Sequence, residues 1–442
     1  MATPTPVAPA SVYREEVGLG IWEHRGKVAV AGMGHSPTNR RWDGKPETSM
    51  GAYAILAIRN AMEDAGVSPD QVDGLIVVRA GTTGDAWAPR PIPEDFAQTY
   101  AHTDNIEDGL TTLSVEWLLQ NMPELTNVSC VMHTRSDCMS NAVVLTAQIV
   151  GDGLAKCCLV VKGWANPEGR YGHGGANALA VAPGASQWTM PFGMVSGIPG
   201  TAFGFEQYCR RYNTSHDRVA PFVVNQRRNG LLFPEGFYAQ HEPYQLTVDD
   251  YLQTRWISKP MSLHDCDRPI QTAGAYLFTT AERARDMKQR PVYILGHSSQ
   301  RWTNRSSIQT LDEIEASTDL MARKTYEASG LTAKDIDVFN PYDGYALFTQ
   351  YYLEAFQWHG VRRGEAHDFY GDDIRVEGPH PFSSSGGNNG NGRTRFWMHT
   401  DCIQQLRGQA GARQIRLKAE TAISGGPTPG GADWTVWSSS PD

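Results

Sequence analysis

The sequence predicts an α/β protein in which two similar halves, each made of β-strands alternating with helices, share one core. Two observations support this fold class. One pattern of strand, helix and glycine occurs twice along the 442 residues, and 40% of the residues are hydrophobic, which is enough for a large buried core. Strands that alternate with helices indicate a parallel sheet with helices packed on its faces.

The first repeated unit begins at Val28 and again at Val292. The segments "VAVAGMGHS" and "VYILGHSSQ" are both β-rich runs that end at or near Gly-His-Ser. Further along, "AMEDAGVSPDQVDGLIV" is echoed by "TYEASGLTAKDIDVFNP", which pairs Gly66 with Gly330 and Asp73 with Asp337 at an offset of 264. We expect each glycine to cap its helix in a left-handed conformation.

A second repeated unit pairs "QIVGDGLAKCCLVV" with "QLRGQAGARQIRLK" at an offset of 257. The helix that follows Ser136 is apolar on nearly every side, which indicates burial at the centre of the fold. Its partner is predicted to begin near Arg393. The N-termini of two central helices would then face a common site, where their partial positive charge and free N–H groups stabilise anions.

These repeats divide the chain into five segments. We expect an N-terminal arm at 1–25, an N-terminal half at 26–163, an insert at 164–265, the last strand and helix of the N-terminal half at 266–290, and a C-terminal half at 291–442. The insert is rich in glycine and aromatic residues and has no counterpart in the second copy. An insert over a central site typically builds the substrate pocket; a lobe that stabilises a dimer is the alternative.

Composition excludes several classes of function. The net charge is -9 and no stripe of Lys and Arg is present, so nucleic acid is not an expected partner. No apolar run approaches the roughly 20 residues that span a bilayer, and the segment "MATPTPVAPASVY" lacks the apolar core of a signal peptide. We therefore expect a soluble, cytoplasmic protein without a membrane partner.

Cysteine and glycine patterns exclude two further kinds of site. The seven cysteines form no CxxC pair and no Cys/His cluster with zinc spacing, so neither a metal site nor a disulfide framework is expected. The "GMGHS" segment after the first predicted strand lacks the complete GxGxxG fingerprint of a dinucleotide site.

With these features the sequence resembles those of the thiolase superfamily, specifically of its sterol-carrier-protein-linked and lipid-transfer-type branch. The resemblance extends from Lys27 to Trp437 and rests on the duplication, on "NAMEDAGVSPDQVDGL" and on the insert stretch "VVNQRRNGLLFPEGFYAQHEPYQLTVDDYLQTRWISKPMSLHDCDRP". It implies a thiolase fold, with two duplicated βαβ halves packed as αβαβα layers and a loop-domain insert.

The positions that carry thiolase chemistry are changed in this sequence. Thiolases use a cysteine at the start of the central helix, a histidine in an HDC-type motif and a histidine in a GHP motif. Alignment on "GDGLAKC" puts Ser136 at the nucleophile position, with Cys138 two residues away. Tyr342 stands in place of the HDC histidine, Asp343 is retained, and Arg393 lines up with the GHP histidine.

The same changes resemble a different branch of the superfamily, the aldolases that cleave side chains of steroid-like acyl-CoA thioesters. "YDGY", the "SSSGG" loop followed by Gly-Arg, and the tail "QLRGQAGARQ" carry this resemblance, although Ser383 departs from the asparagine expected there. It implies retro-aldol cleavage of a β-hydroxyacyl-CoA with a bulky apolar side chain such as a steroid. Coenzyme A enters as part of the substrate, and no cofactor is expected in the chain.

Retro-aldol cleavage needs an acid/base, and Tyr342 and Tyr345 are the candidates, provided that a neighbouring cation lowers the pKa of a phenol. Asp343 is favoured as a residue that orients the loop by accepting from backbone N–H groups. Predicted substrate-binding residues are Gly386, Gly387, Asn388, Asn389, Arg393 and His380. Backbone N–H groups of this loop would bind the enolate oxygen. Arg393 would bind a phosphate, tune a tyrosine or cap the loop, and His380 is favoured as structural.

Two other functions stay open on the sequence alone. Cys138 could act as the covalent nucleophile of a thiolase or acyltransferase, or the chain could be a non-catalytic scaffold with this fold. The resemblance also implies assembly. An edge strand would pair across a twofold to form a homodimer, and a small zinc-ribbon/OB-fold companion subunit would give a two-plus-two complex.

Overall fold

The computed structural model describes residues 17–78, 94–101, 109–110, 112–134, 138–166, 187–194, 196–300 and 309–442. Strands of the first half are β1 (Val28–His35), β2 (Gly74–Val77), β3 (Cys130–His133), β4 (Cys157–Trp164) and β7 (Thr272–Thr280). Strands of the second half are β8 (Val292–Ser299), β9 (Val338–Pro341), β10 (Thr421–Thr428) and β11 (Gly431–Ser438). The insert contributes a hairpin of β5 (Trp256–Ser258) and β6 (Met261–Ser262).

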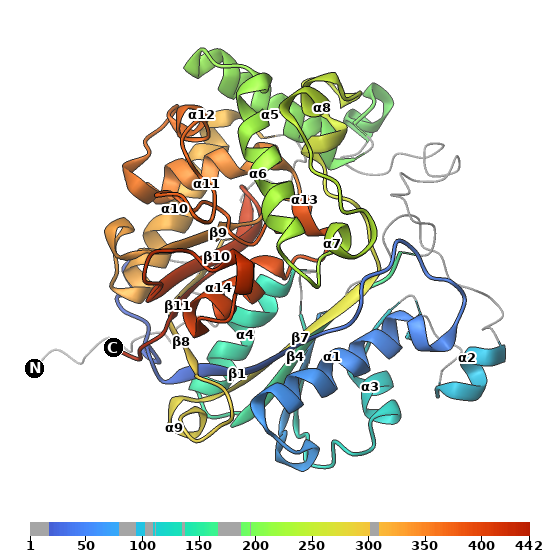
Figure 1. The fold of residues 1–442 in the computed structure, drawn as a ribbon. Helices are drawn as coiled ribbons and strands as arrows, with labels where there is room; N and C mark the ends of the chain where they lie inside the picture. Colours follow the sequence, from blue (N-terminus) through green and yellow to red (C-terminus); the bar gives the residue numbers. More distant parts are fainter. Residues whose placement is uncertain are drawn as a thin grey trace, which may run out of the picture.

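The duplication is visible in the order of the nine-stranded sheet, which is β3-β2-β4-β7-β1-β8-β11-β10-β9 (Figure 1). The run β2-β4-β7-β1 is mirrored by β9-β10-β11-β8, and β1 and β8 meet at the centre. Strands β1 and β8, β2 and β9, and β4 and β10 begin 264 residues apart. The offset seen between Gly66 and Gly330 therefore extends over most of each half.

The expectation of a parallel sheet is correct for only part of it. Strand β2 runs parallel to β3 and β4, and β9 runs parallel to β10, whereas β7, β1, β8 and β11 pair antiparallel with their neighbours. In the second half the reason is local. Only residues 429–430 separate β10 from β11, and so short a connection can join only antiparallel strands.

Helices and strands stack in five layers, αβαβα. The two halves of the nine-stranded sheet form the two β layers, and this arrangement confirms the predicted fold class. Helix α1 (Met50–Ala65) covers the outer face of the first half, and α10 (Leu311–Ser329) and α11 (Thr349–Phe356) cover that of the second. Helices α4 (Met139–Gly151) and α14 (Trp397–Arg407) lie between the halves. Alternate strand residues face alternate cores, because successive side chains point to opposite faces of a sheet.

The first central helix is buried on all sides, as its composition predicts. Every residue of α4 from Met139 to Val150 is buried. Helix α14 begins at Trp397, so the prediction that it begins near Arg393 is wrong. The reason is the backbone before it. Gly392 (φ +88°) and Arg395 (φ +64°) are left-handed, and a right-handed helix cannot include such residues.

The second repeated unit holds for the helices but not for the strand after them. The strand implied by "RQIRLK" is not formed, and β10 begins only at Thr421. Residues 408–420 connect α14 to β10, whereas 152–156 connect α4 to β4. The left-handed glycine after α4 is Gly153 (φ +76°) and not Gly151, while Gly408 (φ +73°) caps α14 as expected.

The insert forms a helical cap over the second half, with α5, α6 and α8 grouped together (Figure 1). Its helices are α5 (Gly197–Tyr212), α6 (Ala220–Leu231), α7 (Phe237–His241) and α8 (Val248–Gln253). Shorter helices elsewhere are α2 (Glu94–Thr99), α3 (Val115–Asn121), α9 (Ala281–Ala284), α12 (Ala366–Phe369) and α13 (Gly387–Asn391). None of the described helices has both the length and the apolar character needed to cross a bilayer.

Candidate active site

Strand β9 delivers Tyr342 and Asp343 to the centre of the molecule. The strand ends at Pro341, and the Tyr342 N–H then donates to the carbonyl of Gly425 on the neighbouring β10. A Cβ at Gly426 would overlap the Tyr342 side chain, so glycine is needed there for the ring to lie against the strand. The ring is 6% exposed.

Asp343 organises the glycine-rich loop that contains α13. Its Oδ1 accepts from Asn388 N at 2.6 Å, and its Oδ2 accepts from Asn389 N at 3.2 Å and from Gln226 Nε2 at 2.7 Å. The carboxyl is fully buried. Burial raises its pKa to about 7, although these three donors act in the opposite direction. This geometry supports the loop-orienting role over a direct catalytic one.

Glycine is needed in this loop because other parts of the chain pack closely against its backbone. A Cβ at Gly386 would overlap the backbone of Gly230 on α6, and one at Gly387 would overlap the Asp343 carboxylate. The loop's backbone N–H groups donate within the protein: Gly387 to Ser385 Oγ, and Asn388 and Asn389 to Asp343. The predicted backbone enolate hole at Gly386–Asn389 is therefore wrong, because Asp343 and Ser385 already use its donors.

The side chains of Asn388 and Asn389 in the loop have different roles. Asn388 Oδ1 accepts from the N–H groups of Thr394 and Arg395 at 2.9 and 3.1 Å, so this side chain holds the next turn of the loop. Asn389 Nδ2 donates to the Asp343 carbonyl at 2.8 Å, and its side chain also lines a cavity of about 470 Å³. Of the predicted loop residues, Asn389 is the one that reaches this cavity.

Tyr342 meets a carboxylate that the sequence did not single out. At Gly344 a Cβ would overlap the Tyr342 hydroxyl and lie 2.8 Å from Asp267 Oδ2, so the phenol and the carboxylate approach the same point. Burial, followed by the charge of Asp267, raises the pKa of Tyr342 well above its usual value, and Arg395 and Arg393 only partly oppose this. The two cations lower the phenol pKa as expected, but burial outweighs them, so the pKa is raised overall.

Tyr345 lies beside the same group of charges. It forms an isolated β-bridge with Cys266, and burial raises its pKa to about 12, with the charges of Cys266 and Asp267 adding to the rise. Its side chain lines a second cavity of about 210 Å³ together with Ile314, Phe348 and Tyr351. Both tyrosines are therefore protonated at neutral pH and can donate a proton.

Two arginines complete the cluster. The guanidinium of Arg393 lies 4.5 Å from the centre of the Trp164 ring, and that of Arg395 lies 5.7 Å from the same ring and 5.8 Å from the Tyr342 ring. The sequence predicts Arg393 as a site residue. It does not reveal Arg395, although "GRTRF" places this residue only two positions later, because nothing in the sequence indicates its left-handed backbone.

The larger cavity adjoins this cluster through Asp267. Its lining includes Cys266, Asp267 and Asn389 together with four arginines: Arg40, Arg227, Arg255 and Arg268. Arg227 is 4% exposed and lies 3.4 Å from the centre of the Tyr238 ring. Within the described part of the chain, neither Nε nor Nη1 of Arg227 has a hydrogen-bond partner. A buried cation in such a place is suited to an anionic ligand.

The central helices meet at their N-termini, and the thiol of Cys138 is not exposed there. Cys138 is the N-cap of α4, is fully buried, and its Sγ donates to Ser140 Oγ at 3.5 Å. Ser140 Oγ in turn bonds His399 Nε2 on the first turn of α14 at 2.8 Å. Ser136 lies outside the described residues. Burial makes Cys138 a packing and hydrogen-bonding residue here, in line with the structural interpretation of this thiol.

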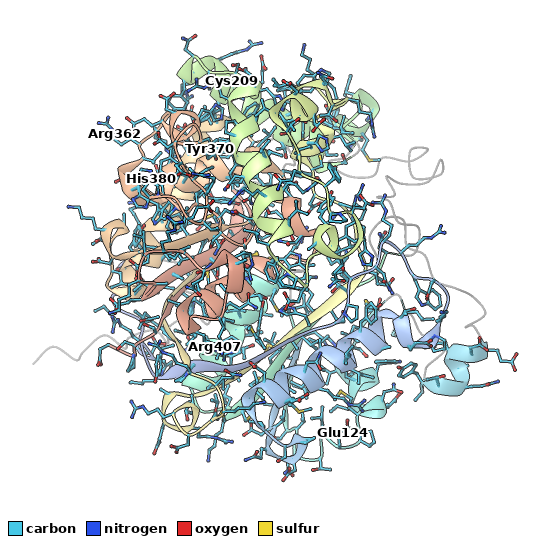
Figure 2. All side chains as sticks on the ribbon, viewed as in Figure 1. Glu124, Cys209, Arg362, Tyr370, His380 and Arg407 are labelled. Atoms are coloured by element: carbon cyan, nitrogen blue, oxygen red, sulfur yellow. The ribbon has the colours of Figure 1, made fainter. Side chains whose placement is uncertain are left out.

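His380 lies at the outer side of the second half (Figure 2). Its ring centre is 4.8 Å from that of His359 and 5.5 Å from that of Phe369, and its Nδ1 is 4.0 Å from Asp372 Oδ2. These contacts favour the structural alternative for His380, and its assignment to substrate binding stays a prediction.

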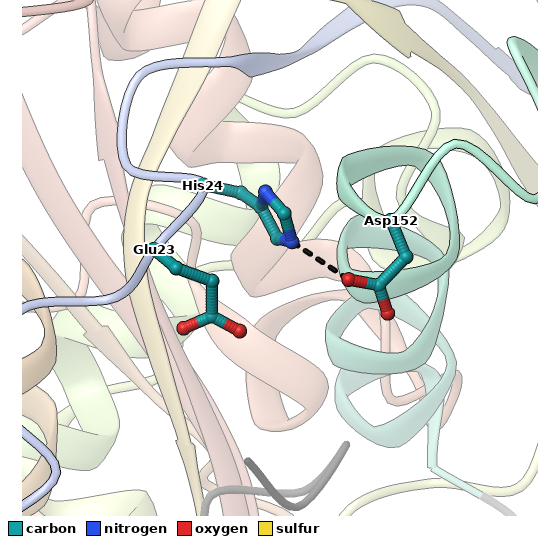
Figure 3. Close-up of side chains that lie close together, drawn as sticks. All are labelled: Glu23, His24 and Asp152. Atoms are coloured by element: carbon teal, nitrogen blue, oxygen red, sulfur yellow. Dashed lines mark hydrogen bonds and ion pairs between the residues drawn. The ribbon is translucent and has the colours of Figure 1, made fainter. Parts of the chain in front are cut away.

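One group of possible metal ligands lies at the opposite end of α4. Glu23, His24 and Asp152 bring their ligand atoms within 4.8 Å of one another (Figure 3). His24 Nε2 already bonds Asp152 Oδ1 at 2.7 Å, and both carboxylates are exposed. This contact fixes the N-terminal segment to the end of α4, and it does not involve the tyrosine cluster.

Comparisons with known proteins agree with this architecture. The thiolase C-terminal domain-like family matches residues 299–432. A 17-hydroxy-3-oxo-4-pregnene-20-carboxyl-CoA lyase of Mycobacterium tuberculosis is 26% identical over 428 residues, covering 92% of this chain and 98% of the relative. The chain has a thiolase C-terminal domain-like segment and resembles thiolase-superfamily proteins over nearly its whole length.

Within the superfamily, the aldolases resemble this chain over most of its length. A steroid side-chain-cleaving aldolase of Thermomonospora curvata is 25% identical over 380 residues, covering 82% of this chain and 85% of the relative. The solved Ltp2-ChsH2(DUF35) aldolase covers 93% of this chain and 98% of its own, with a TM-score of 0.73 at 20% identity. Human mitochondrial 3-ketoacyl-CoA thiolase covers 94% and 100%, with a TM-score of 0.61 at 13% identity.

Proposed function

We propose that this thiolase-superfamily chain is a carbon-carbon lyase that cleaves a β-hydroxyacyl-CoA by a retro-aldol reaction. The observation that carries the proposal is the cluster of Tyr342, Tyr345, Asp267, Arg393 and Arg395, in which Asp267 also lines a cavity that contains four arginines. The named relatives of the chain are a carboxyl-CoA lyase and a steroid side-chain-cleaving aldolase, and their chemistry is of this class.

The acyl group is proposed to be bulky and apolar, with a steroid-derived side chain as the leading candidate. Two features of the molecule support it besides the relatives. The cavity that contains Tyr345 has a mostly apolar surface, to which Ile314 and Phe348 contribute. It lies directly beside the Cys266–Tyr345 bridge, where a tail could extend from the reacting carbons.

The coenzyme A part of the substrate fits the larger cavity. Its phosphates are anionic, and Arg227 offers a buried guanidinium with two nitrogens that have no hydrogen-bond partner among the described residues. Charge-assisted bonds from arginine to phosphate are stronger than neutral ones. The reacting thioester would then lie in the same cavity, near Asp267 and Asn389.

The tyrosines are proposed to be proton donors. Cleavage of the bond between the α- and β-carbons leaves its electron pair on the thioester, which forms an enolate without help from a lysine. A protonated phenol then delivers a proton to the α-carbon, and the arginines stabilise the negative charge that develops. The raised pKa of each tyrosine suits a donor, because the phenol keeps its proton at neutral pH.

Burial of Cys138 speaks against the thiolase or acyltransferase alternative, because a covalent nucleophile must reach the substrate. The thiol is fully buried and donates to Ser140. The substrate-sized cavities at the tyrosine cluster favour an enzyme over a non-catalytic scaffold.

Assembly as a homodimer is a further part of the proposal. Strand β3 is at the edge of the sheet, with Val131 47% and Met132 38% exposed. An exposed edge with apolar side chains is suited to pairing with a second copy. The solved Ltp2-ChsH2(DUF35) aldolase is named for two components, so we also propose a small companion subunit, with zinc-ribbon/OB-fold architecture and two-plus-two stoichiometry, and a cytoplasmic location.

The direct test is an assay of the purified chain, alone and with its companion, on a β-hydroxyacyl-CoA that carries a bulky apolar side chain. We expect release of a ketone and a shorter acyl-CoA. Light scattering at micromolar concentration should give the mass of a dimer. No ketone release under either condition would refute the proposed reaction, and a monomer would refute the assembly.

A further inference from the structure

We propose that Asp267 is the general base that removes the proton from the β-hydroxyl group of the substrate. The inference rests on the proposed retro-aldol function and assigns a role that the tyrosines leave unfilled. It follows from where Asp267 lies, what it contacts and which group can accept a proton there.

Two backbone contacts hold Asp267 against the loop that contains the tyrosines. Its backbone N–H donates to the Gly344 carbonyl at 3.0 Å, and the residue before it, Cys266, forms the β-bridge with Tyr345. Asp267 lies between the insert and β7, whereas Gly344 follows β9 of the second half. The carboxylate is thereby held at a fixed position beside both phenols.

Asp267 is also the acidic side chain that lines the larger cavity. It is 6% exposed and lines that cavity together with Cys266 and Asn389. Its Oδ2 and the Tyr342 hydroxyl both lie against the face of Gly344 where a Cβ would be. The carboxylate therefore lies at the cavity wall and next to the phenol of Tyr342.

The other titratable groups near the tyrosines are less suited to act as the general base. Tyr345 has a pKa of about 12 and Tyr342 is raised further, so either phenol would first have to lose a proton that it holds at neutral pH. Asp343 is not among the lining residues of the larger cavity, and its carboxylate holds the loop through Asn388, Asn389 and Gln226. The charged groups that act on the same tyrosines as Asp267 are Arg393 and Arg395, and Asp267 itself also acts on Asp343.

The proton and electron balance of the step is complete. The carboxylate of Asp267 accepts the β-hydroxyl proton, the oxygen becomes the ketone oxygen, and the bond between α- and β-carbons breaks toward the thioester. The resulting enolate takes a proton from Tyr342 or Tyr345 at its α-carbon. Protonated Asp267 then returns a proton to the phenolate directly or through water, which restores the starting state.

The test is Asp267→Asn, which keeps the shape of the side chain but removes the base. We expect the rate constant of cleavage to fall by at least about a hundredfold, with KM for the acyl-CoA within about threefold of wild type. Asp267→Ala should be equally slow and should regain activity when formate is added, because formate fits the space of the missing carboxylate. The matched control is Asp368→Asn, since Asp368 is a surface carboxylate 81% exposed.

The outcomes separate this inference from the proposed function. Absence of cleavage by the wild-type chain with its companion would refute the function. Cleavage by wild type together with near-normal cleavage by Asp267→Asn, or no effect of formate on a folded Asp267→Ala, would overturn the role of Asp267. If Asp267→Asn does not fold, Asp267→Glu replaces it. The glutamate keeps the base, and activity no greater than that of Asp267→Ala would contradict the assignment.

Discussion

The two halves of the molecule are alike where they build the scaffold and different where they build the site. Asp73, just before β2, accepts from the N–H groups of Lys156 and Cys157 at the start of β4. Asp337, just before β9, accepts from those of Glu420 and Thr421 at the start of β10. Beyond the other ends of these strands the equivalence stops, because the described cluster takes Tyr342, Tyr345 and the arginines from the second half and Asp267 from the segment between the insert and β7.

This difference indicates which parts of the chain can be changed without loss of chemistry. The duplicated contacts determine stability, and the unmatched segments determine the reaction. Substitutions in the second half and insert should therefore affect rate or substrate binding, whereas substitutions at duplicated positions should affect the free energy of unfolding.

The largest effect is expected at the tyrosines, which have no counterpart in the first half. Tyr342→Phe, or failing that Tyr345→Phe, should lower the rate constant of cleavage by at least about a hundredfold, as is typical when a proton-transfer group is removed. Acyl-CoA affinity and melting temperature should change little. Near wild-type cleavage by both single variants would show that neither phenol carries the proton.

The next effect concerns the insert. Arg227→Gln removes a buried cation from the larger cavity and should raise KM for the acyl-CoA by about 10- to 100-fold, as expected for the loss of a charge-assisted bond worth about 1.5 to 3 kcal/mol. Arg362→Gln is the control, because Arg362 is a surface residue paired with Glu365 (Figure 2). Equal KM values for the two variants would place the phosphates elsewhere.

Asp343 gives a dependence of stability on pH. Its pKa in the folded protein is about 7, above the usual 3.8, so between these values the folded state holds a proton that the unfolded state releases. The free energy of unfolding should therefore fall as pH rises from about 4 to above 7. Urea unfolding should show a weaker pH dependence for Asp343→Asn; an identical dependence would mean that Asp343 does not hold this proton.

The equivalent aspartates Asp73 and Asp337 test the part of the comparison that concerns stability. Asp73→Ala and Asp337→Ala should each lower the free energy of unfolding by about 1 to 3 kcal/mol, because each leaves two backbone N–H groups without their acceptor. Cleavage by the folded fraction should stay near wild type. A selective loss of activity in Asp337→Ala would mean that the second half couples this contact to the site.

The smallest effect is expected at Cys138. Cys138→Ala removes one buried sulfur and should cost about 1 kcal/mol of stability, with most cleavage activity retained. More than a hundredfold loss of turnover in a folded variant would restore the covalent-nucleophile hypothesis.

The scaffold could be predicted from the sequence because its determinants are local. Gly66 and Gly330 are both left-handed helix caps, and the run of apolar residues identifies α4 as buried. The site could be predicted only in part. Tyr342 and Arg393 occupy positions that resemble those of a family, but Asp267 and Arg227 reach the cavity through tertiary contacts of the insert. The glycine-rich loop suggested free N–H donors, and only the structure places Asp343 against them.

The central claim is that cleavage proceeds through a thioester enolate and needs no acyl-enzyme. It is tested most directly by incubating the enzyme with a β-hydroxyacyl-CoA in D₂O without added coenzyme A and weighing the released acyl-CoA by mass spectrometry. We expect cleavage without free coenzyme A and at least one solvent-derived deuterium on the α-carbon of that product. A requirement for free coenzyme A, with an acyl group found on Cys138, would contradict the account.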